Sequence, residues 1–172
     1  MILPATLRTL EEADLFLVRQ WRNHPDVRRY MYTQHEISEG EHRAWFKRSQ
    51  HDPNRHLMLA EANGQPFGFV SIQLENDEPH RAVWGFYLAP EAPRGSGQAL
   101  GGVALAFAFD QLGLHKLCGE ALASNQRSLA FHERFGFVRE SLLRDHHFDG
   151  NTYHDVIGFG LFRSEWQLQQ GA

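Results

Sequence analysis

Apolar and polar positions along the chain recur with two periods, which predict alternating strands and helices. Seven segments show the alternation or the short apolar runs of strands: 5–10, 56–61, 66–74, 82–88, 116–123, 137–143 and 152–162. Four segments show helical spacing or helix-start signals: a first helix from Thr9 or Asp14 to Asn23, then 38–50, 98–112 and 125–135. The order predicts a single α/β domain over 1–172, built on one sheet.

Turn residues and unpatterned stretches divide these elements. Asn63-Gly64 predicts a tight hairpin, and Asp149-Gly150-Asn151 predicts a second one near the C-terminus. Residues 26–37, rich in arginine and aromatic groups, are expected to be irregular. A polar loop is expected at 75–80, and a frayed tail from about residue 164.

A short glycine-rich loop stands between the fourth predicted strand and the apolar helix after it. It reads Arg94-Gly95-Ser96-Gly97-Gln98-Ala99. Two glycines let the backbone bend sharply and approach a ligand closely. The free N–H groups and the positive dipole end of the following helix would face that ligand. This arrangement predicts binding of a di- or polyphosphate, although a plain glycine turn before a helix is the simpler alternative.

The loop and a downstream segment together resemble one enzyme family. R-x-x-G-x-A at 94–99 resembles the acetyl-coenzyme A signature of the GNAT N-acetyltransferases, and NQRSLAFHERFGF at 125–137 resembles the family's N-x-x-S-x-x-F/Y-Y-E-K-x-G-F segment. The matching residues are Asn125, Ser128, Phe131, Glu133, Arg134, Gly136 and Phe137. His132 stands where the family usually has tyrosine. The resemblance implies a mixed sheet whose central parallel strands splay apart to admit acetyl-CoA, flanked by helices.

The same resemblance assigns contacts to the cofactor. The residues expected to bind acetyl-CoA are Leu88 through its backbone, Arg94, Gly95, Ser96, Gly97, Gln98, Ala99, Asn125 and Ser128. Asn125 also suits the N-cap of its helix, and both roles are compatible.

Acetyl transfer to an amine needs a base for the amine and a proton for the departing thiolate. His132 is the candidate general acid, because imidazole can replace the family's phenol as a donor. Tyr153 or Tyr87 are competing donors, and solvent is a third if His132 lies on the surface. Glu120 is the candidate base, acting through a water; it interrupts an apolar strand and is expected to be partly buried. A solvent-facing strand residue is the alternative.

The N-terminal third bears on the acceptor. W-R-N at 21–23, V-R-R-Y-M at 27–31 and E-H-R-A-W-F at 41–46 resemble the branch that acetylates the 4-amino group of a UDP-linked 4-amino-4,6-dideoxy sugar on the way to pseudaminic acid. The residues expected to bind that nucleotide sugar are Trp21, Arg22, Arg28, Arg29, Tyr30, His42 and Trp45. Alternatively, Trp21 and Trp45 anchor their helices in the core.

Other acceptors and another class of protein stay open. The same fold serves polyamine and ribosomal-protein-type N-terminal acetyltransferases, and the missing tyrosine also allows a non-catalytic acetyl-CoA-binding module. The arginines weigh against a polyamine, because a polycation needs an acidic lining.

Composition narrows the partners. The net charge is −4 with both signs interspersed, which gives no basic footprint for nucleic acid or membrane. The single cysteine, Cys118, cannot form an internal disulfide, and no signal peptide or membrane span is evident, so a cytoplasmic setting is expected. His146, His147, His154 and Asp155 match no zinc spacing, so no metal is expected. Family analogy makes a homodimer possible.

Overall fold

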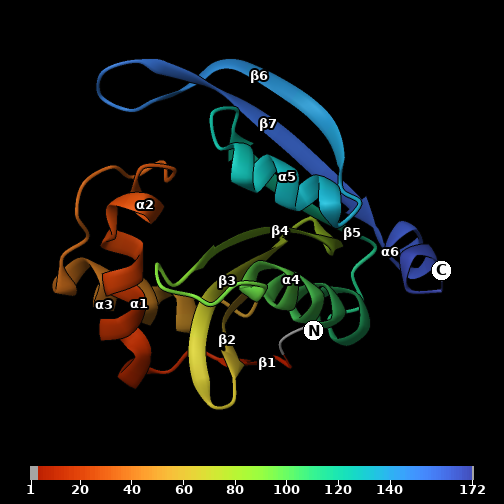
Figure 1. Ribbon diagram of the computed structural model, residues 1–172, viewed down its shortest axis with the longest axis horizontal. Coiled ribbons are helices and arrows are strands. Elements are labelled where there is room, and N and C mark those ends of the chain that lie inside the picture. The colour runs from red at the N-terminus through yellow and green to blue at the C-terminus, as the bar shows by residue number, and fades with distance from the viewer. Residues whose placement is uncertain (1–3, 172) are drawn as a thin grey trace.

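The fold is built on one mixed sheet, with strand order β1-β2-β3-β4-β5-β7-β6 (Figure 1). The computed structural model describes residues 4–171. The strands are β1 (Thr6–Thr9), β2 (Arg55–Ala62), β3 (Gln65–Glu75), β4 (Glu78–Leu88), β5 (Lys116–Leu122), β6 (Val138–Phe148) and β7 (Tyr153–Phe162). The helices are α1 (Leu15–Asn23), α2 (Pro25–Arg28), α3 (Glu39–Gln50), α4 (Ser96–Ala106), α5 (Gln126–Arg134) and α6 (Arg163–Gln170). A 3₁₀ turn, η1 (Glu12–Asp14), precedes α1, and a π turn, η2 (Phe107–Gln111), follows α4.

The sheet opens between β4 and β5, which form a parallel pair. They pair at three positions: Arg81 with Lys116, Ala82 with Leu117 and Val83 with Cys118. Beyond these positions β4 continues to Leu88 and β5 continues to Leu122, and the two strands are no longer paired. All the other strand pairs of the sheet are antiparallel. The predicted splay of the central parallel strands is therefore confirmed.

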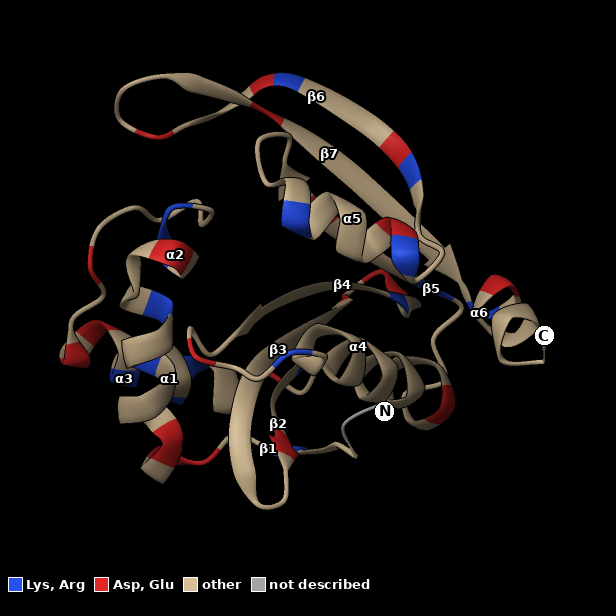
Figure 2. Cartoon of the chain, in the orientation of Figure 1, with Lys and Arg blue, Asp and Glu red and all other residues tan. Residues whose placement is uncertain are grey.

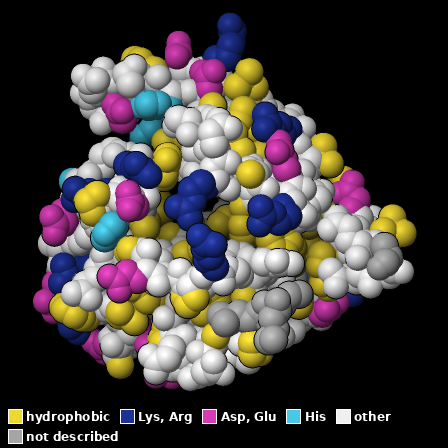
Figure 3. All heavy atoms as spheres, in the orientation of Figure 1, with side chains coloured by type: hydrophobic (Ala, Val, Ile, Leu, Met, Phe, Trp, Pro, Cys, Tyr) yellow, Lys and Arg dark blue, Asp and Glu magenta, His cyan; other side chains and the backbone are white. Residues whose placement is uncertain are grey.

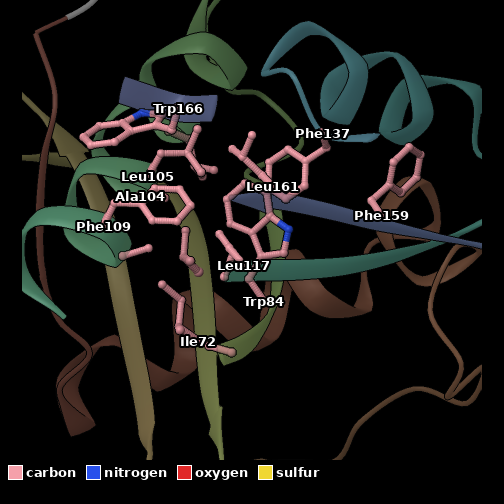
Figure 4. Close-up of a cluster of buried hydrophobic side chains, with 14 of the residues drawn as sticks. Ile72, Trp84, Ala104, Leu105, Phe109, Leu117, Phe137, Phe159, Leu161 and Trp166 are labelled. Atoms are coloured by element: carbon pink, nitrogen blue, oxygen red, sulfur yellow. The ribbon is translucent and has the colours of Figure 1, made fainter. Parts of the chain in front are cut away.

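Two clusters of buried side chains hold the helices against the sheet. The larger joins α4, η2 and α6 to the central strands, with Trp84, Leu117 and Leu161 near its middle and Phe159 at its edge (Figure 4). The smaller joins α1 and α3 to β2 and β3. The N-terminal helices therefore lie on one side of the opening in the sheet, and α4 and α5 border it (Figure 1).

Local signals predicted several boundaries correctly. Asn63 and Gly64 both have positive φ, 51° and 71°, as a tight two-residue hairpin requires. Ser38 and Glu41 form the predicted capping box at the start of α3. These features depend on residues that are neighbours in the sequence, which is why the pattern reveals them.

Three predictions about element ends were wrong. The expected loop at 75–80 is a two-residue turn, since Glu75 already pairs with Glu78 across β3 and β4. The second half of the expected helix 98–112 widens into η2, where the Leu112 N–H donates to the Phe107 carbonyl at 3.0 Å. Strand β6 runs past Leu143 to Phe148, because the β6–β7 hairpin projects beyond the body of the protein and its polar residues face solvent (Figure 1).

The expected frayed tail is instead a helix, α6. Glu165 caps it by accepting a hydrogen bond from the Phe162 N–H at 2.9 Å. Trp166 is buried and stacks on Phe109 of η2, with ring centroids 5.3 Å apart. One aromatic anchor and one cap therefore order a segment that composition alone suggests is a tail.

Candidate active site

A cavity of about 350 Å³ lies where β4 and β5 separate. Its walls come from β4, β5, the start of α5 and the segment after α2; the lining residues that matter below are Tyr30, Tyr32, Tyr87, Glu120, Asn125, Ser128 and His132. A larger recess of about 500 Å³ lies at the other end of β4, near the β3–β4 turn. Its arginines already bond to neighbours, Arg81 to Glu75 and Arg55 to Gln73. We therefore place the site at the smaller cavity.

The glycine-rich loop forms an anion cradle at the start of α4. Gly95 is the N-cap, with φ of +90°, a left-handed conformation that favours glycine. The N–H groups of Ser96 and Ala99 bond to the carbonyls of Pro93 and Gly95, at 3.2 and 3.0 Å. Within the described chain this leaves the first-turn amides of Gly97 and Gln98 without a backbone acceptor, and the buried Ser96 hydroxyl has no partner either. These free donors fit the pyrophosphate of acetyl-CoA.

The cradle adjoins both β4 and α5. A Cβ placed on Gly97 would lie 3.9 Å from Leu88 at the end of β4, and equally far from Phe131 of α5. The loop, the last residue of β4 and the helix that carries the second motif therefore converge. This convergence is what the predicted cofactor contacts of Leu88 and of the loop require.

Asn125 and Ser128 lie at the start of α5 and line the cavity. The Asn125 side-chain oxygen accepts a hydrogen bond from the Ser128 N–H at 3.1 Å, so Asn125 is the N-cap of α5. A cofactor contact of either residue stays a prediction.

Basic side chains surround the hollow on this face (Figure 3). Figure 2 shows basic positions in the loop before α4, at the end of α2 and at the start of α5. In the sequence these segments contain Arg94, the adjacent Arg28 and Arg29, and Arg127. The face is thus locally basic although the chain carries a net charge of −4. Arg127 was not predicted as a site residue, because it falls at a variable position of the second motif. It lies in the first turn of α5 between Asn125 and Ser128, which line the cavity, and a guanidinium at that position could bind a phosphate group.

His132 is buried at the floor of the cavity, and both of its ring nitrogens are bonded. Nδ1 lies 2.8 Å from the Ser128 carbonyl oxygen, which only accepts, so Nδ1 carries the proton. Nε2 accepts a hydrogen bond from the Trp84 indole N–H at 3.2 Å, so Nε2 carries none. Burial lowers the pKa of His132, and the bond to the Ser128 carbonyl opposes this only in part. The imidazole is therefore neutral, in one fixed tautomer.

This geometry bears on the choice of proton donor. The general-acid hypothesis for His132 requires an N–H aimed at the thiolate, and here Nδ1–H points to a carbonyl while Nε2 accepts. Of the competing tyrosines, Tyr153 is exposed near the hairpin tip, where it packs on Phe148. Tyr87 lines the cavity, and burial raises the pKa of its phenol. Tyr87 is thus the better placed of the two.

Glu120 lines the cavity as predicted for a base, but the expected partial burial is wrong. Its side chain is exposed because β4 has diverged at this level and its cross-strand partner on β7 is Gly158, which has no side chain to cover it. The Glu120 carboxylate accepts one hydrogen bond, from the Tyr32 hydroxyl at 2.8 Å. Tyr32 was missed by sequence reasoning, since it lies in the irregular segment and nothing local marks it.

The aromatic residues expected at the acceptor site take two different positions. Trp21 is buried in the core between the N-terminal helices and the sheet, as the core-anchor alternative proposed. Trp45 is partly buried, stacks on His42 at 5.0 Å and meets Phe69, a cavity residue, edge-on at 6.0 Å. Tyr30 lines the cavity itself.

The charged residues expected there also differ from one another. Arg28 and Arg29 form surface ion pairs with Glu36 and Asp26, at 3.7 and 3.5 Å. Arg22 donates to the Thr33 carbonyl at 3.1 Å through Nη2, while its Nη1 is buried without a partner. Burial lowers the pKa of Arg22, and nearby Tyr87 opposes this.

His42 lies close to the guanidinium of Arg22. It is buried, with Nδ1 unpartnered, and burial together with Arg19 and Arg22 lowers its pKa to about 4.

The two buried histidines predict a loss of stability on acidification. Both pKa values lie below the unfolded value of 6.5, so below that pH the unfolded state takes up protons more readily. The stabilisation is complete above pH 6.5 and is lost as pH falls toward 4. His42 contributes to this loss because its pKa in the folded state is about 4. Thermal unfolding from about pH 7.5 to about pH 4.5 should show a falling Tm, with a smaller fall in His42→Gln. A Tm that is flat between about pH 7 and about pH 5 would contradict the burial argument.

Comparison with known proteins decides the family. Residues 5–138 match the family described as Acetyltransferase (GNAT) domain. The chain belongs to the GNAT acetyltransferases. It is therefore an acyltransferase that uses acetyl-CoA as co-substrate, and the non-catalytic alternative is set aside.

This GNAT chain resembles spermidine acetyltransferases over nearly its whole length and PseH over a shorter part. It is 27% identical to a spermidine N(1)-acetyltransferase of Vibrio cholerae over 164 residues, covering 94% of each chain. It is 28% identical to the acetyltransferase PseH of Campylobacter jejuni over 132 residues, covering 75% of this chain and 80% of PseH. The crystal structure of a Vibrio cholerae spermidine N-acetyltransferase with CoA and spermine superimposes with a TM-score of 0.88 at 25% identity, covering 95% and 98% of the two chains. The predicted likeness to the pseudaminic-acid branch is thus not established over a likeness to polyamine enzymes.

Two further findings concern what the described residues lack. In residues 4–171 no helix is long and apolar enough to cross a membrane. Over the same range, no three His, Cys, Asp or Glu side chains are grouped so as to hold a metal ion.

Proposed function

We propose that this acetyltransferase acts on an amine whose remaining part is anionic, with the 4-amino group of a UDP-4-amino-4,6-dideoxy sugar as the specific acceptor. The observation that carries the proposal is the half-buried guanidinium of Arg22, whose Nη1 is buried without a partner, near the unpartnered Nδ1 of His42. A buried charge without a counter-ion is costly, and a ligand phosphate would supply one.

The position of these groups links them to the reaction. Arg22 lies near Tyr87, which lines the cavity, and Trp45 reaches the cavity through Phe69. Arg28 and Arg29 are engaged only in surface ion pairs, which are worth ~0–1 kcal/mol and exchange readily for a ligand. Tyr30 lines the cavity, and the cationic groups that would meet a nucleotide diphosphate lie behind its wall, which supports the proposal.

The acetyl transfer needs two proton transfers: the acceptor amine loses a proton, and the departing thiolate of CoA gains one. Acetyl-CoA supplies the acetyl group as a thioester. The acceptor nitrogen forms a bond to the carbonyl carbon as the bond from carbon to sulfur breaks. Glu120 takes the proton from the amine through a water, and the thiolate gains a proton from Tyr87 or from solvent. His132 has a different, structural role in this scheme, because its imidazole fixes Trp84 and the floor of the cavity.

A polyamine is the second candidate, favoured by the spermidine acetyltransferases among the similar proteins. Among the described residues that line this cavity, Glu120 is the carboxylate that could attract a cation, whereas the arginines of the N-terminal helices, which do not line it, would repel one. A peptide N-terminus is a third possible acceptor.

The test is thiol release from acetyl-CoA with three parallel acceptors: a UDP-4-amino-4,6-dideoxy sugar, spermidine and a peptide that begins with serine. We expect release with the nucleotide sugar. Release with spermidine or the peptide but none with the sugar would overturn the acceptor assignment and leave the family unchanged.

Replacing Arg22 by glutamine should raise the KM for the nucleotide sugar by ~10-fold or more, because a charge-assisted contact to phosphate is lost. The KM for acetyl-CoA should stay the same. Arg43→Gln is the matched control: Arg43 pairs with Glu12 and Glu39 on the surface. Equal effects of the two substitutions on the sugar KM would remove Arg22 from the acceptor site.

A further inference from the structure

Tyr32 joins three parts of the chain that are distant in sequence. Its hydroxyl donates to the Glu120 carboxylate at 2.8 Å, across 88 positions. Its ring packs on His147 of β6, with centroids 4.8 Å apart. Tyr32 therefore connects the segment after α2 to β5 and to the β6–β7 hairpin, at the rim of the cavity.

The segment that carries Tyr32 is irregular but firmly held. The Asn23 side chain bonds to both backbone groups of Ile37: it donates to the carbonyl at 2.8 Å and accepts from the N–H at 2.7 Å. Arg22 donates to the Thr33 carbonyl at 3.1 Å. These hydrogen bonds from α1 fix the chain just after Tyr32, at Thr33 and Ile37. They therefore hold the Tyr32 hydroxyl in a defined position.

Tyr32 is half exposed, so it is not a core residue with an incidental hydrogen bond. Burial of its phenol and the adjacent Glu120 carboxylate both raise its pKa, which keeps the hydroxyl protonated and donating. Among the described residues, Tyr32 is the one hydrogen-bond partner of the Glu120 carboxylate. Without it, an exposed glutamate would sample several rotamers.

We propose that Tyr32 is a positioning residue for the acetyl transfer: its hydroxyl holds the Glu120 carboxylate toward the cavity, where it receives the proton of the amine. The inference deepens the proposed function, because it takes Glu120 as the base, but it does not depend on which acceptor is correct. The positioned carboxylate oxygen bonds to Tyr32, and the other oxygen remains free to face the bridging water.

The test is a double-mutant cycle on kcat, run with whichever acceptor releases thiol. Tyr32→Phe keeps the ring on His147 and removes only the hydroxyl, and Glu120→Gln removes the base. We expect Tyr32→Phe to lower kcat by ~10-fold with the KM for acetyl-CoA unchanged. The double variant should be no slower than Glu120→Gln alone, because Tyr32 then has no base to position.

Several results would overturn the inference. Multiplicative effects of the two substitutions would show that Tyr32 acts independently of Glu120. An unchanged kcat in Tyr32→Phe would show that the hydrogen bond has no part in the reaction. A slow Tyr32→Phe beside a fully active Glu120→Gln would remove both this inference and the assignment of the base. Activity with spermidine in place of the sugar would instead affect only the acceptor assignment, since the cycle would then be measured with spermidine.

Discussion

Glutamine at position 120 should lower kcat by ~10²- to 10⁴-fold, the range for loss of a general base. The substitution is nearly isosteric and keeps an oxygen for the Tyr32 hydroxyl, which lies 2.8 Å from the carboxylate in the wild type. It removes only the ability to take a proton. Because Glu120 is exposed, no buried packing is lost, and the variant should fold normally. Steady-state thiol release with the active acceptor measures the effect.

The pH dependence of this deficit separates proton transfer from simple binding. As pH rises toward the pKa of the acceptor amine, more of the acceptor is already neutral and needs no base, so the gap between Glu120→Gln and wild type should narrow. Asp110→Asn is the matched control, an exposed acid on η2 that does not line the cavity. A deficit that is constant across pH, or a comparable loss in Asp110→Asn, would contradict the assignment of Glu120 as base.

Alanine at position 132 should lower the free energy of unfolding by ~3–5 kcal/mol, as for other large buried aromatic side chains. The His132 ring is almost fully buried and stacks on Phe159, with centroids 4.5 Å apart. The substitution leaves a cavity, and it also leaves the Trp84 indole N–H without the acceptor it has at 3.2 Å. A buried donor without a partner adds its own cost of ~1–3 kcal/mol.

Urea unfolding of the wild type, His132→Ala and His146→Ala measures this difference. His146 is an exposed histidine on the same hairpin as His147, and its substitution should change stability by less than ~0.5 kcal/mol. If His132→Ala unfolded within ~1 kcal/mol of wild type but lost most of its kcat, His132 would be a catalytic group after all. The outcome therefore decides between the structural role seen in the geometry and the acid role expected from the family motif.

The features that were predictable from the sequence depend on short-range signals. The glycine-rich loop, the Asn125 cap and the Asn63-Gly64 hairpin each consist of glycine or asparagine at adjacent or nearby positions. The backbone conformations that these residues allow determine the local structure. Of the predicted cofactor-binding residues on these motifs, Asn125 and Ser128 line the cavity. The family motif identified the fold because it contains two such signals in the correct order.

The features that were missed depend on contacts between distant positions. Trp84 reaches His132 across 48 positions, and no periodicity in either strand or helix indicates that bond. The exposure of Glu120 depends on the divergence of β4 and on a glycine in β7. The burial of Trp166 depends on the π turn that brings Phe109 beneath it. None of these can be inferred from a residue and its immediate neighbours.

Only three residue pairs join β4 to β5. The sheet therefore consists of two parts, or panels, β1–β4 and β5–β7–β6, connected by this short paired stretch, called the seam. Past the seam, the separation of the panels is set by the bulk of the aromatic wedge between them: Trp84 and Phe86 on one panel meet His132 and Phe131 of α5. The width of the cavity is therefore a property of core side chains. Trp84, Phe86 and His132 also line the cavity, whereas Phe131 packs behind them on Phe86 and Trp84. A substitution at Phe131 should therefore change the width of the cavity without contact to the acceptor, so a comparison of cavity-lining residues alone would miss it.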